Sequence, residues 1–524
     1  MKRLGILILL LATGCCVTLS ESVTSSDSEV GIWNCFELQT EHPDVLDDPY
    51  RDTELQVTLT APDGEVIHYW GFYDGGQTWK IRFSPNRLGE WRYEYWFKEK
   101  KNEVVKGSFK CVGSTTPGMV ALDESNPFWL GLKGGEHRLF RSFHVGDRFF
   151  ATNWDDPADE EDGNPRTAFL NWFQENGYNM MSVASHYTNR QEKSRGEGWE
   201  TPKLWPLDYR EFQKMEIILD ELCERDITIY PFAGFFGAKG EWPAEHDEQE
   251  LYIRYILARI GHYPNTILTV AGPEPFWRQD KSQYGWNMRM DDIVRLGKLI
   301  DENDVHDHVL TIHNEKRATK YGDPFIYDDW YEMSTLQGPT TLDRDELFGG
   351  LVSNHHPEKA CFAQETLWFG NMFHPKYTND DIRRNTLAIL FAGAILNFAD
   401  MNGNSSSGFS GTLDFEDLHQ EQHDIVHKVW DWFETIPYYR FRTHQELVRN
   451  GFCLAEPGEE YYIYLDFENE FRMDLDYPHT FQSEWINAVN FEDVREGPEL
   501  IERVKIRTPD GKPQWILHIW KSEE

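Results

Sequence analysis

Two glutamates, Glu274 and Glu365, are the residues of this chain whose surroundings best suit chemistry. Each follows a short apolar run, and each has a tryptophan three residues further on, Trp277 and Trp368. A pair of carboxylates can cleave a glycosidic bond, one as nucleophile and one as acid and base, and a tryptophan face can stack on a sugar ring. The two motifs therefore predict sugar chemistry, provided that the fold brings the two glutamates together.

The elements that must position them alternate between strand and helix over residues 117–443. We predict strands at 139–145, 179–184, 227–231, 266–270, 309–312, 332–336, 360–363 and 395–398. We predict helices at 166–176, 209–225, 249–260, 290–302, 345–354, 380–394 and 421–433. Eight strands with intervening helices favour a (β/α)8 TIM barrel over an open doubly wound sheet, and the chain has no Gly-rich phosphate loop.

The barrel gives the two glutamates a common location. Active sites of such barrels lie at the carboxyl ends of the strands. Glu274 follows the predicted strand four and Glu365 the predicted strand seven. These strands lie across the barrel from each other, so the two carboxylates are expected to converge over its mouth.

The segments on either side of the barrel have the period of two that is typical of strands. Residues 31–115 alternate apolar and polar side chains between turns such as Pro62-Asp63-Gly64, and residues 446–524 do so again. Short strands without helical periods predict an antiparallel β-sandwich in each segment. The predicted fold is a multidomain chain, a (β/α)8 barrel flanked by an N-terminal and a C-terminal β-sandwich.

The amino terminus has the pattern of an export signal. Residues 1–16 begin with charged residues and continue with a short apolar run that is too short for a permanent membrane span. Residues 12–15 resemble a bacterial lipoprotein cleavage box with Ala in place of the usual Leu, which makes Cys15 a candidate for lipidation. Residues 17–30 would then form a flexible tether. We expect an exported protein that is a periplasmic or cell-surface lipoprotein or is secreted.

Charge and cysteine content narrow the range of partners. The formal net charge of −38 argues against nucleic acid and against an anionic membrane surface as partners, so any membrane attachment is expected only through a lipid anchor.

The cysteines are candidates for a disulfide rather than for metal binding. No CxxC pair is present, which argues against a structural zinc site. Cys35 and Cys111 lie in the first and last strand-like runs of the first domain and are the candidates for a disulfide. The oligomeric state is not predicted.

Several blocks of the sequence resemble a known group of enzymes. Carboxylates after strands four and seven are the signature of glycoside hydrolase clan GH-A. The blocks 107–111, 312–314 and 453–464 are similar to those of bacterial glycoside hydrolases with an N-terminal Ig-like domain, an apiosidase-like TIM barrel and a C-terminal β-sandwich. The resemblance implies that Glu274 is the acid/base and Glu365 the nucleophile. Many clan members have Asn before the acid/base, where it binds the sugar 2-hydroxyl, whereas this chain has Pro273.

Other residues at strand ends are candidates for the sugar pocket, with Trp277 and Trp368 as stacking platforms. They are His144, His186, Phe235, His313, Asn314 and Gln337. Three histidines at separate strand ends would also suit zinc, but there is no HExxH pair and their spacing is irregular. We therefore expect neither a metal nor a cofactor.

The sequence supports one main functional hypothesis and one alternative. The main one is a glycoside hydrolase that cleaves a plant or algal polysaccharide or oligosaccharide by a retaining, double-displacement mechanism. The alternative is a noncatalytic glycan-binding lipoprotein on a barrel scaffold. The sugar, the linkage and the choice between exo and endo action are left open.

Overall fold

The chain forms two compact units, which are described separately. The computed structural model describes residues 16–19, 28–135, 137–146, 149–150, 165–183, 203–232, 234–235, 242–272, 275, 288–314, 316–371, 373–400, 418–475, 479–500 and 503–522. The first unit comprises the chain up to Thr116 together with Gln213–Asp226 and Arg254–Pro264. The second unit contains the rest of the chain.

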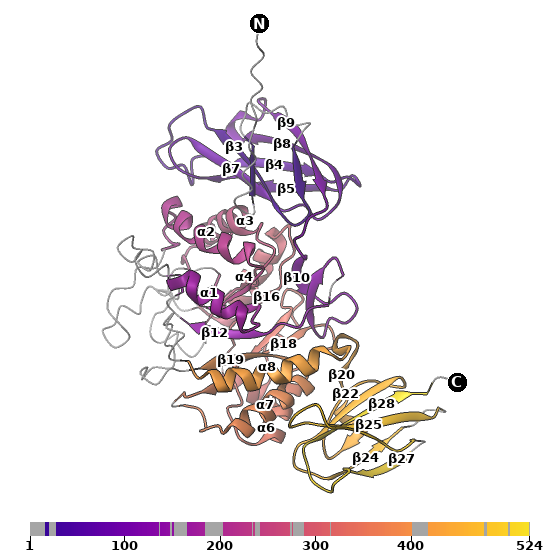
Figure 1. The fold of residues 1–524 in the computed structure, drawn as a ribbon. Coiled ribbons are helices and arrows are strands. Elements are labelled where there is room, and N and C mark those ends of the chain that lie inside the picture. The colour runs from indigo at the N-terminus through magenta and orange to yellow at the C-terminus, as the bar shows by residue number, and fades with distance from the viewer. Residues whose placement is uncertain are drawn as a thin grey trace. The chain divides into compact units, whose positions relative to one another are not determined.

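Eight parallel strands of the second unit form a barrel (Figure 1). In chain order they are β12 (Ser142–Gly146), β13 (Met180–Val183), β14 (Thr228–Pro231), β15 (Leu268–Thr269), β16 (Leu310–Thr311), β17 (Met333–Leu336), β18 (Ala360–Phe369) and β19 (Ala394–Asp400). Their order in the sheet is β14-β13-β12-β19-β18-β17-β16-β15. A parallel bridge between Ile229 and Thr266 joins the two ends, and the Ile229 amide donates to the Asn265 carbonyl at 2.8 Å. The predicted (β/α)8 barrel is confirmed.

A helix follows each barrel strand. The helices are α1 (Pro165–Glu175), α2 (Tyr209–Glu224), α3 (His246–Ile260), α4 (Met290–Asn303), α5 (Lys316–Tyr321), α6 (Arg344–Val352), α7 (Asn379–Phe391) and α8 (Gln420–Glu434). Seven of them were predicted to within a few residues. The exception is α5, whose six residues are too few to show a helical period.

Local sequence signals explain where two of these helices begin. Asp343 precedes α6, and its carboxylate accepts hydrogen bonds from the amides of Asp345 and Glu346. Thr378 and Asp381 form a capping box at the start of α7. Such caps satisfy amide groups that have no partner within the helix, so they fix the first turn.

A hairpin closes the barrel at the amino ends of its strands. It consists of β10 (Met119–Leu122) and β11 (Leu130–Lys133), which pair antiparallel. Its side chains Val120, Leu130 and Leu132 join one buried cluster with residues at the beginnings of the barrel strands, such as Met333 and Ala360. Because this end is filled with apolar side chains, a substrate has access to the barrel interior only from the carboxyl ends.

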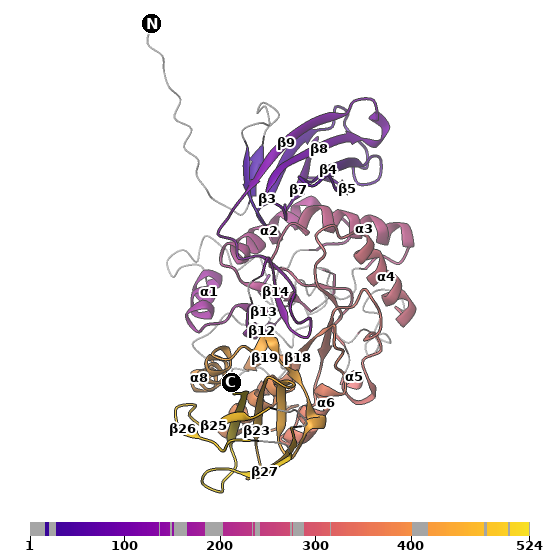
Figure 2. The same ribbon diagram turned by 90° about the vertical axis from the view of Figure 1, so that its right-hand side faces the viewer.

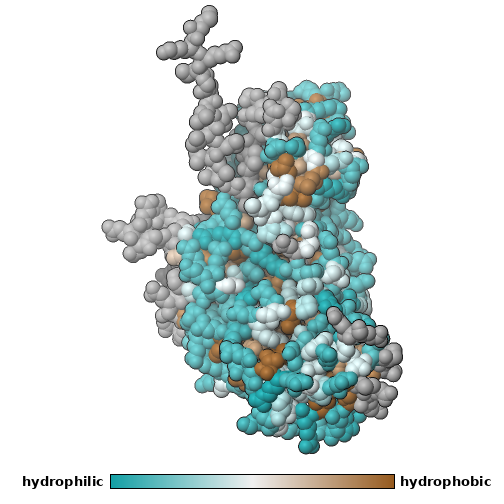
Figure 3. Space-filling view, turned by 45° about the vertical axis from the view of Figure 1, so that its right-hand side comes forward, coloured by the Kyte–Doolittle hydropathy of each residue, from teal (hydrophilic) through white to brown (hydrophobic). Residues whose placement is uncertain are grey.

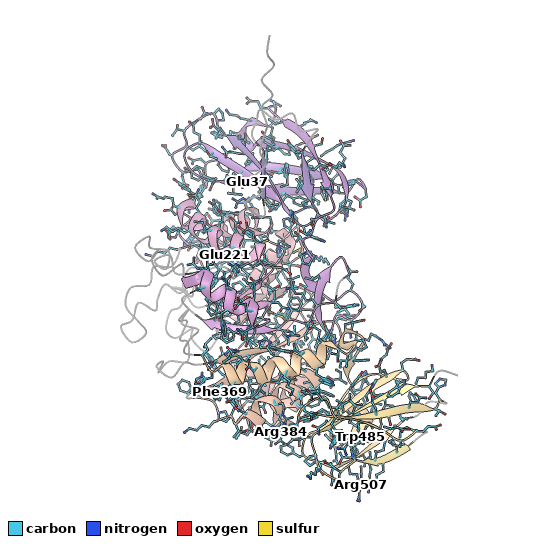
Figure 4. The ribbon with its side chains drawn as sticks, in the orientation of Figure 1. Glu37, Glu221, Phe369, Arg384, Trp485 and Arg507 are labelled. Carbon is cyan, nitrogen blue, oxygen red and sulfur yellow. The ribbon has the colours of Figure 1, made fainter. Side chains whose placement is uncertain are left out.

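The C-terminal segment is a two-sheet sandwich, as predicted (Figure 2). The six-stranded sheet contains β20 (Arg442–Thr443), β22 (Phe452–Glu456), β23 (Glu460–Leu465), β28 (Trp515–Lys521), β25 (Phe481–Asn487) and β26 (Val494–Glu496). The three-stranded sheet contains β21 (Val448–Arg449), β24 (Glu470–Asp474) and β27 (Arg503–Arg507). Trp485, labelled in Figure 4, belongs to the shared core. Arg384 of α7, also labelled there, binds both carboxylate oxygens of Asp466, at 2.6 and 2.8 Å, and so ties the barrel to this sandwich.

The N-terminal segment is also a two-sheet sandwich, as predicted. One sheet has the order β1 (Cys16–Leu19), β3 (Cys35–Glu41), β7 (Thr78–Phe83) and β6 (Phe72–Tyr73). The other has the order β2 (Glu29–Gly31), β9 (Val105–Val112), β8 (Gly89–Phe97), β4 (Leu55–Thr60) and β5 (Val66–Trp70).

The predicted disulfide between Cys35 and Cys111 is wrong. Cys111 is a free, buried thiol, whereas Cys35 is disulfide-bonded. The two residues lie in different sheets: Cys111 pairs with Val30 and Gly89, while the residue in register with Cys35 on β1 is Cys16. Period-two patterns predict strands but not the sheet to which each strand belongs, so position in the sequence gave the wrong pair.

Two further features concern the surface and the membrane. The face shown in Figure 3 is largely hydrophilic, with hydrophobic side chains in small separate groups, which agrees with a net charge of −38. Across the described part of the chain, no helix is both long and apolar enough to cross a bilayer. The lipidation candidate Cys15 lies outside the described residues.

Candidate active site

A bulge in β18 brings Gln364 and Glu365 into the barrel together. The register of β18 against β19 moves from Ala363 opposite Leu396 to Leu367 opposite Phe398, so three residues of β18 stand opposite Asn397 alone. In a regular strand, neighbouring side chains point to opposite faces. The bulge removes this constraint, and both side chains reach His313.

Glu365 is a buried carboxylate with Gln337 and His313 beside it. The residue is 8% exposed. Gln337 donates from Nε2 to Oε2 at 2.8 Å, and Nε2 of His313 lies 3.4 Å from Oε1. Burial alone would raise the pKa of Glu365, but the contact with His313, the nearby His144 and the Gln337 hydrogen bond outweigh burial and lower it to about 2. The carboxylate is therefore an anion at any physiological pH.

The protonation of His313 is set by a chain of hydrogen bonds behind it. Tyr230 donates its hydroxyl to Oε1 of Gln364 at 2.8 Å, which turns the amide nitrogen of Gln364 toward Nδ1 of His313 at 3.1 Å. Because Nδ1 accepts this hydrogen bond, the proton of a neutral imidazole resides on Nε2, which faces Glu365. The Nε2 side of the His313 ring thus faces Oε1 of Glu365.

Aromatic rings line the other side of Glu365. The Trp368 ring lies 4.9 Å from the ring of His144 and 6.0 Å from that of His374, between ring centres. Burial lowers the pKa of His374 to about 4, although the charge of Glu365 acts in the opposite direction. Both histidines thus pack against the Trp368 ring, and His374 stays neutral at physiological pH.

The predicted pocket residues are only partly brought together. His313 and Gln337 lie beside Glu365, His144 is close enough to lower its pKa, and the Trp368 ring packs against His144. Glu274, His186 and Trp277 lie outside the described residues.

Two predicted pocket residues belong to other groups. Asn314 donates from Nδ2 to the hydroxyl of Tyr331 at 3.1 Å, since it follows His313 and points to the other side of the strand end. Phe235 is fully buried and stacks on Trp242, with 5.6 Å between ring centres. Neighbouring side chains at a strand end point in opposite directions, which explains the position of Asn314. The prediction considered only that Asn314 follows a strand, not the direction of its side chain.

No sequence pattern pointed to Gln364, His374 or Tyr230. Gln364 was not expected to face inward beside Glu365, because only the bulge permits it. His374 lies in the loop after β18, nine residues beyond Glu365, and not at a strand end. Tyr230 lies within β14, and its position in an apolar run predicts only a core residue.

Gly272 occupies a position where no side chain fits. It follows β15 and leads toward Glu274. A Cβ atom at this position would lie 2.2 Å from the carbonyl oxygen of Phe232 and 2.6 Å from Cβ of His313. The chain therefore passes close behind His313 on its way to the predicted acid/base.

Within the described ranges, no group of three histidine, cysteine, aspartate or glutamate side chains is arranged to hold a metal ion. The chemistry available to the described site is that of a buried anion beside Gln337, His313 and His144.

Comparison with known protein families gives two matches. Residues 141–397 match the family described as apiosidase-like, catalytic domain, and residues 29–98 match a domain of unknown function, DUF5060. The first match contains all eight barrel strands except the end of β19, and it includes Glu274 and Glu365. No curated protein is significantly similar to the chain.

Solved structures share the fold. A candidate glycoside hydrolase from Bacteroides vulgatus ATCC 8482 superposes with a TM-score of 0.69 at 21% identity, covering 94% of this chain and all of the other. A family 5 glycoside hydrolase from the same organism has a TM-score of 0.53 at 14% identity, covering 77% of this chain and 94% of the other. At these identities the structures establish the likeness of the fold.

Replacement of Gly272 tests the close passage behind His313. Gly272→Ala is expected to lower the free energy of unfolding by about 1–3 kcal/mol, because neither the Phe232 carbonyl nor His313 can move without disturbing the strand ends. The matched control is Gly349→Ala in α6, where a Cβ meets nothing within 4 Å, and it is expected to be neutral or stabilising by up to about 1 kcal/mol. Urea-induced unfolding measures both. Equal effects would show that the passage is not tight.

Replacement of Gln364 tests the protonation of His313. In the parent, ¹⁵N NMR of histidine-labelled protein is expected to show His313 with a proton on Nε2 and a bare Nδ1. In Gln364→Glu, both ring nitrogens are expected to be protonated at neutral pH, because the new carboxylate accepts from Nδ1 and stabilises the imidazolium. Gln422→Glu on α8 is the control and should leave the His313 signals unchanged. A bare Nε2 in the parent would contradict this assignment.

The low pKa of Glu365 has a consequence for stability. Since its pKa is about 2 in the folded chain against an ordinary 4.5, the ionised carboxylate stabilises the fold fully above about pH 4.5. This contribution falls by about 1.4 kcal/mol per pH unit as the pH drops from 4.5 toward 2. The difference in free energy of unfolding between the parent and Glu365→Gln should follow this course in urea titrations. A difference that does not change with pH would be incompatible with the lowered pKa.

Proposed function

Because residues 141–397 form an apiosidase-like catalytic domain and the chain is thereby a glycosidase, we propose that it hydrolyses its substrate by a retaining, double-displacement mechanism. In this proposal Glu365 is the nucleophile and Glu274 the acid and base. The observation that carries the proposal is the state of Glu365, a buried carboxylate whose pKa is lowered to about 2 by His313, His144 and Gln337 against the effect of burial.

The first half of the reaction uses this anion. A carboxylate oxygen of Glu365 attacks the anomeric carbon, and the bond from that carbon to the leaving oxygen breaks. Glu274 gives its proton to the leaving oxygen, so the products are a free alcohol and a glycosyl ester of Glu365. An ionised nucleophile and a protonated acid are both needed at the same pH, which requires environments that separate the two pKa values.

The second half uses the same residues in reverse. Glu274, now ionised, removes a proton from water while the water oxygen attacks the anomeric carbon, and the Glu365 carboxylate departs. A group with a pKa near 2 is a weak base and a good leaving group. Gln337 and His313 then donate to the oxygens on which charge reappears, so they stabilise the transition state of this step.

Gln364 positions His313 beside the nucleophile. Its amide nitrogen lies 3.1 Å from Nδ1 of His313, while Nε2 of the same ring lies 3.4 Å from Oε1 of Glu365. The rings of Trp368 and His144 pack against each other beside this group, with 4.9 Å between ring centres.

We propose a polysaccharide or oligosaccharide of plant or algal origin as the substrate. The N-terminal signal, with its lipoprotein-like box ending at Cys15, supports action outside the cytoplasm, where polymers too large for uptake are met. The aromatic walls of the site support a carbohydrate rather than a peptide or nucleotide ligand.

Removal of the nucleophile tests the mechanism. Glu365→Ala is expected to lower reducing-sugar release from plant and marine polysaccharides by a factor on the order of a thousand or more. Added azide should restore turnover of an aryl glycoside, because it fills the space of the lost carboxylate, and the product should be a glycosyl azide of inverted configuration.

The matched control is another buried carboxylate at the opposite end of the barrel. Glu332, just before β17, accepts from the Leu310 amide, and burial raises its pKa to about 7. Glu332→Gln should leave turnover within about twofold of the parent. Near-normal turnover of Glu365→Ala would remove Glu365 from the mechanism. Glycan binding without turnover by the parent would favour the noncatalytic glycan-binding protein.

A further inference from the structure

A second cavity lies on the flank of the barrel, in contact with α4, α5 and α6. Its volume is about 570 Å³, within the range of small-molecule sites. Its lining includes Met290, Asn314, Tyr321, Asp323, Tyr327 and Asn354. Asn314 marks the boundary with the candidate active site, because its neighbour His313 faces Glu365 while Asn314 faces this cavity.

The cavity has a polar wall that is fixed in place. Asp323 is 5% exposed, and its Oδ2 accepts from the hydroxyls of Tyr331 at 2.7 Å and Ser334 at 2.6 Å. Asn354 accepts from the Asp323 amide at 2.8 Å and donates from Nδ2 to the Gly350 carbonyl at 2.8 Å. Groups held in this way lose little freedom when a ligand binds.

Two exposed tyrosine rings flank the same cavity. Tyr321 is 74% exposed and Tyr327 86% exposed. In the described part of the chain, only four large aromatic side chains are more than half exposed, and the other two are Phe373 and Phe467. It is unexpected that half of them border one cavity, since exposed aromatic surface is costly unless it is used.

The other two exposed rings have evident roles. Phe373 lies in the loop after β18, next to His374 of the candidate active site. Phe467 lies under the guanidinium group of Arg384, 4.4 Å from ring centre to carbon. Nζ of Lys320 lies over the Tyr321 ring, 5.2 Å from its centre, and the Tyr327 ring meets that of His356 edge to face, with 6.0 Å between ring centres. Both rings keep most of their surface open to solvent, where a ligand can reach it.

The composition of the wall selects the ligand. No Lys or Arg lines the cavity, and Asp323 is its one carboxylate, so an anion would be repelled. Hydroxyl groups donate well to carboxylate and amide oxygens, and the C–H faces of a sugar ring stack on tyrosine. We propose that this cavity is a second carbohydrate-binding site, which takes an uncharged sugar unit of a glycan chain.

The site would hold a polymer beside the catalytic centre. Asn314 and His313 are consecutive, so one strand end contributes to both places. A chain anchored at the cavity raises the local concentration of its neighbouring segments at the active site without any new catalytic contact. The effect is expected for polymers and not for short substrates.

The test is affinity electrophoresis of the inactive Glu365→Ala protein in gels that contain arabinoxylan, galactomannan or laminarin as uncharged probes. At least one of them should retard the protein. Adding Tyr321→Ala and Tyr327→Ala should weaken that retardation by about tenfold. In the active background, the same two changes should leave turnover of a p-nitrophenyl glycoside within twofold of the parent and lower turnover of the polymer.

A matched control and an acidic probe complete the test. Phe467→Ala removes an exposed aromatic ring far along the sequence from the cavity and should not change the retardation. Retention of full retardation by the double tyrosine variant would overturn the proposal. So would retardation only by the acidic polymers pectin and alginate, or by none of the probes. Because binding is measured without turnover, failure of the catalytic mechanism would not mimic any of these results.

Discussion

The charge of Glu365 is the constraint on which the described site depends. A carboxylate taken out of water loses several kcal/mol of solvation, and only well-placed donors recover it. Each donor depends in turn on another element: Gln337 on the end of β17, His313 on β16, and the orientation of His313 on Gln364 and Tyr230. Because the donors come from separate strands, a small shift of one strand would leave the Glu365 carboxylate without a donor. The closed barrel and its filled amino end supply the rigidity that the charge requires.

Much of the fold could be predicted because it follows from local periods. The alternation of apolar runs with amphipathic segments gave eight strands and seven of the eight helices, and turn-rich segments of period two gave both sandwiches. His313 and Gln337 lie beside Glu365 because strand ends of a barrel face a common site. Asn314 and Phe235 lie in other groups of side chains, because the position of a strand end does not say which way a side chain turns.

The rest required three-dimensional information. Gln364 and Tyr230 act through a hydrogen bond between β14 and β18, which are separated by 134 residues. Cys35 and Cys111 lie in strands β3 and β9 of one sandwich, yet these strands belong to different sheets. The cavity on the flank of the barrel is lined by residues that are ordinary one by one in the sequence. Its suitability for a sugar is visible only when Tyr321, Tyr327 and Asp323 are seen together in the structure.

The bulge in β18 also restricts how this site can change during evolution. It inserts an even number of residues, so that Trp368 beyond it keeps the face that the strand's earlier residues define. Loss or gain of one residue between Ala363 and Leu367 would turn Trp368 away from His144 at the same time as it disturbed Glu365. During evolution this segment should therefore change by substitution, without insertions or deletions. Substrate specificity should instead change through the loops beyond the strand ends, whose length is free to vary.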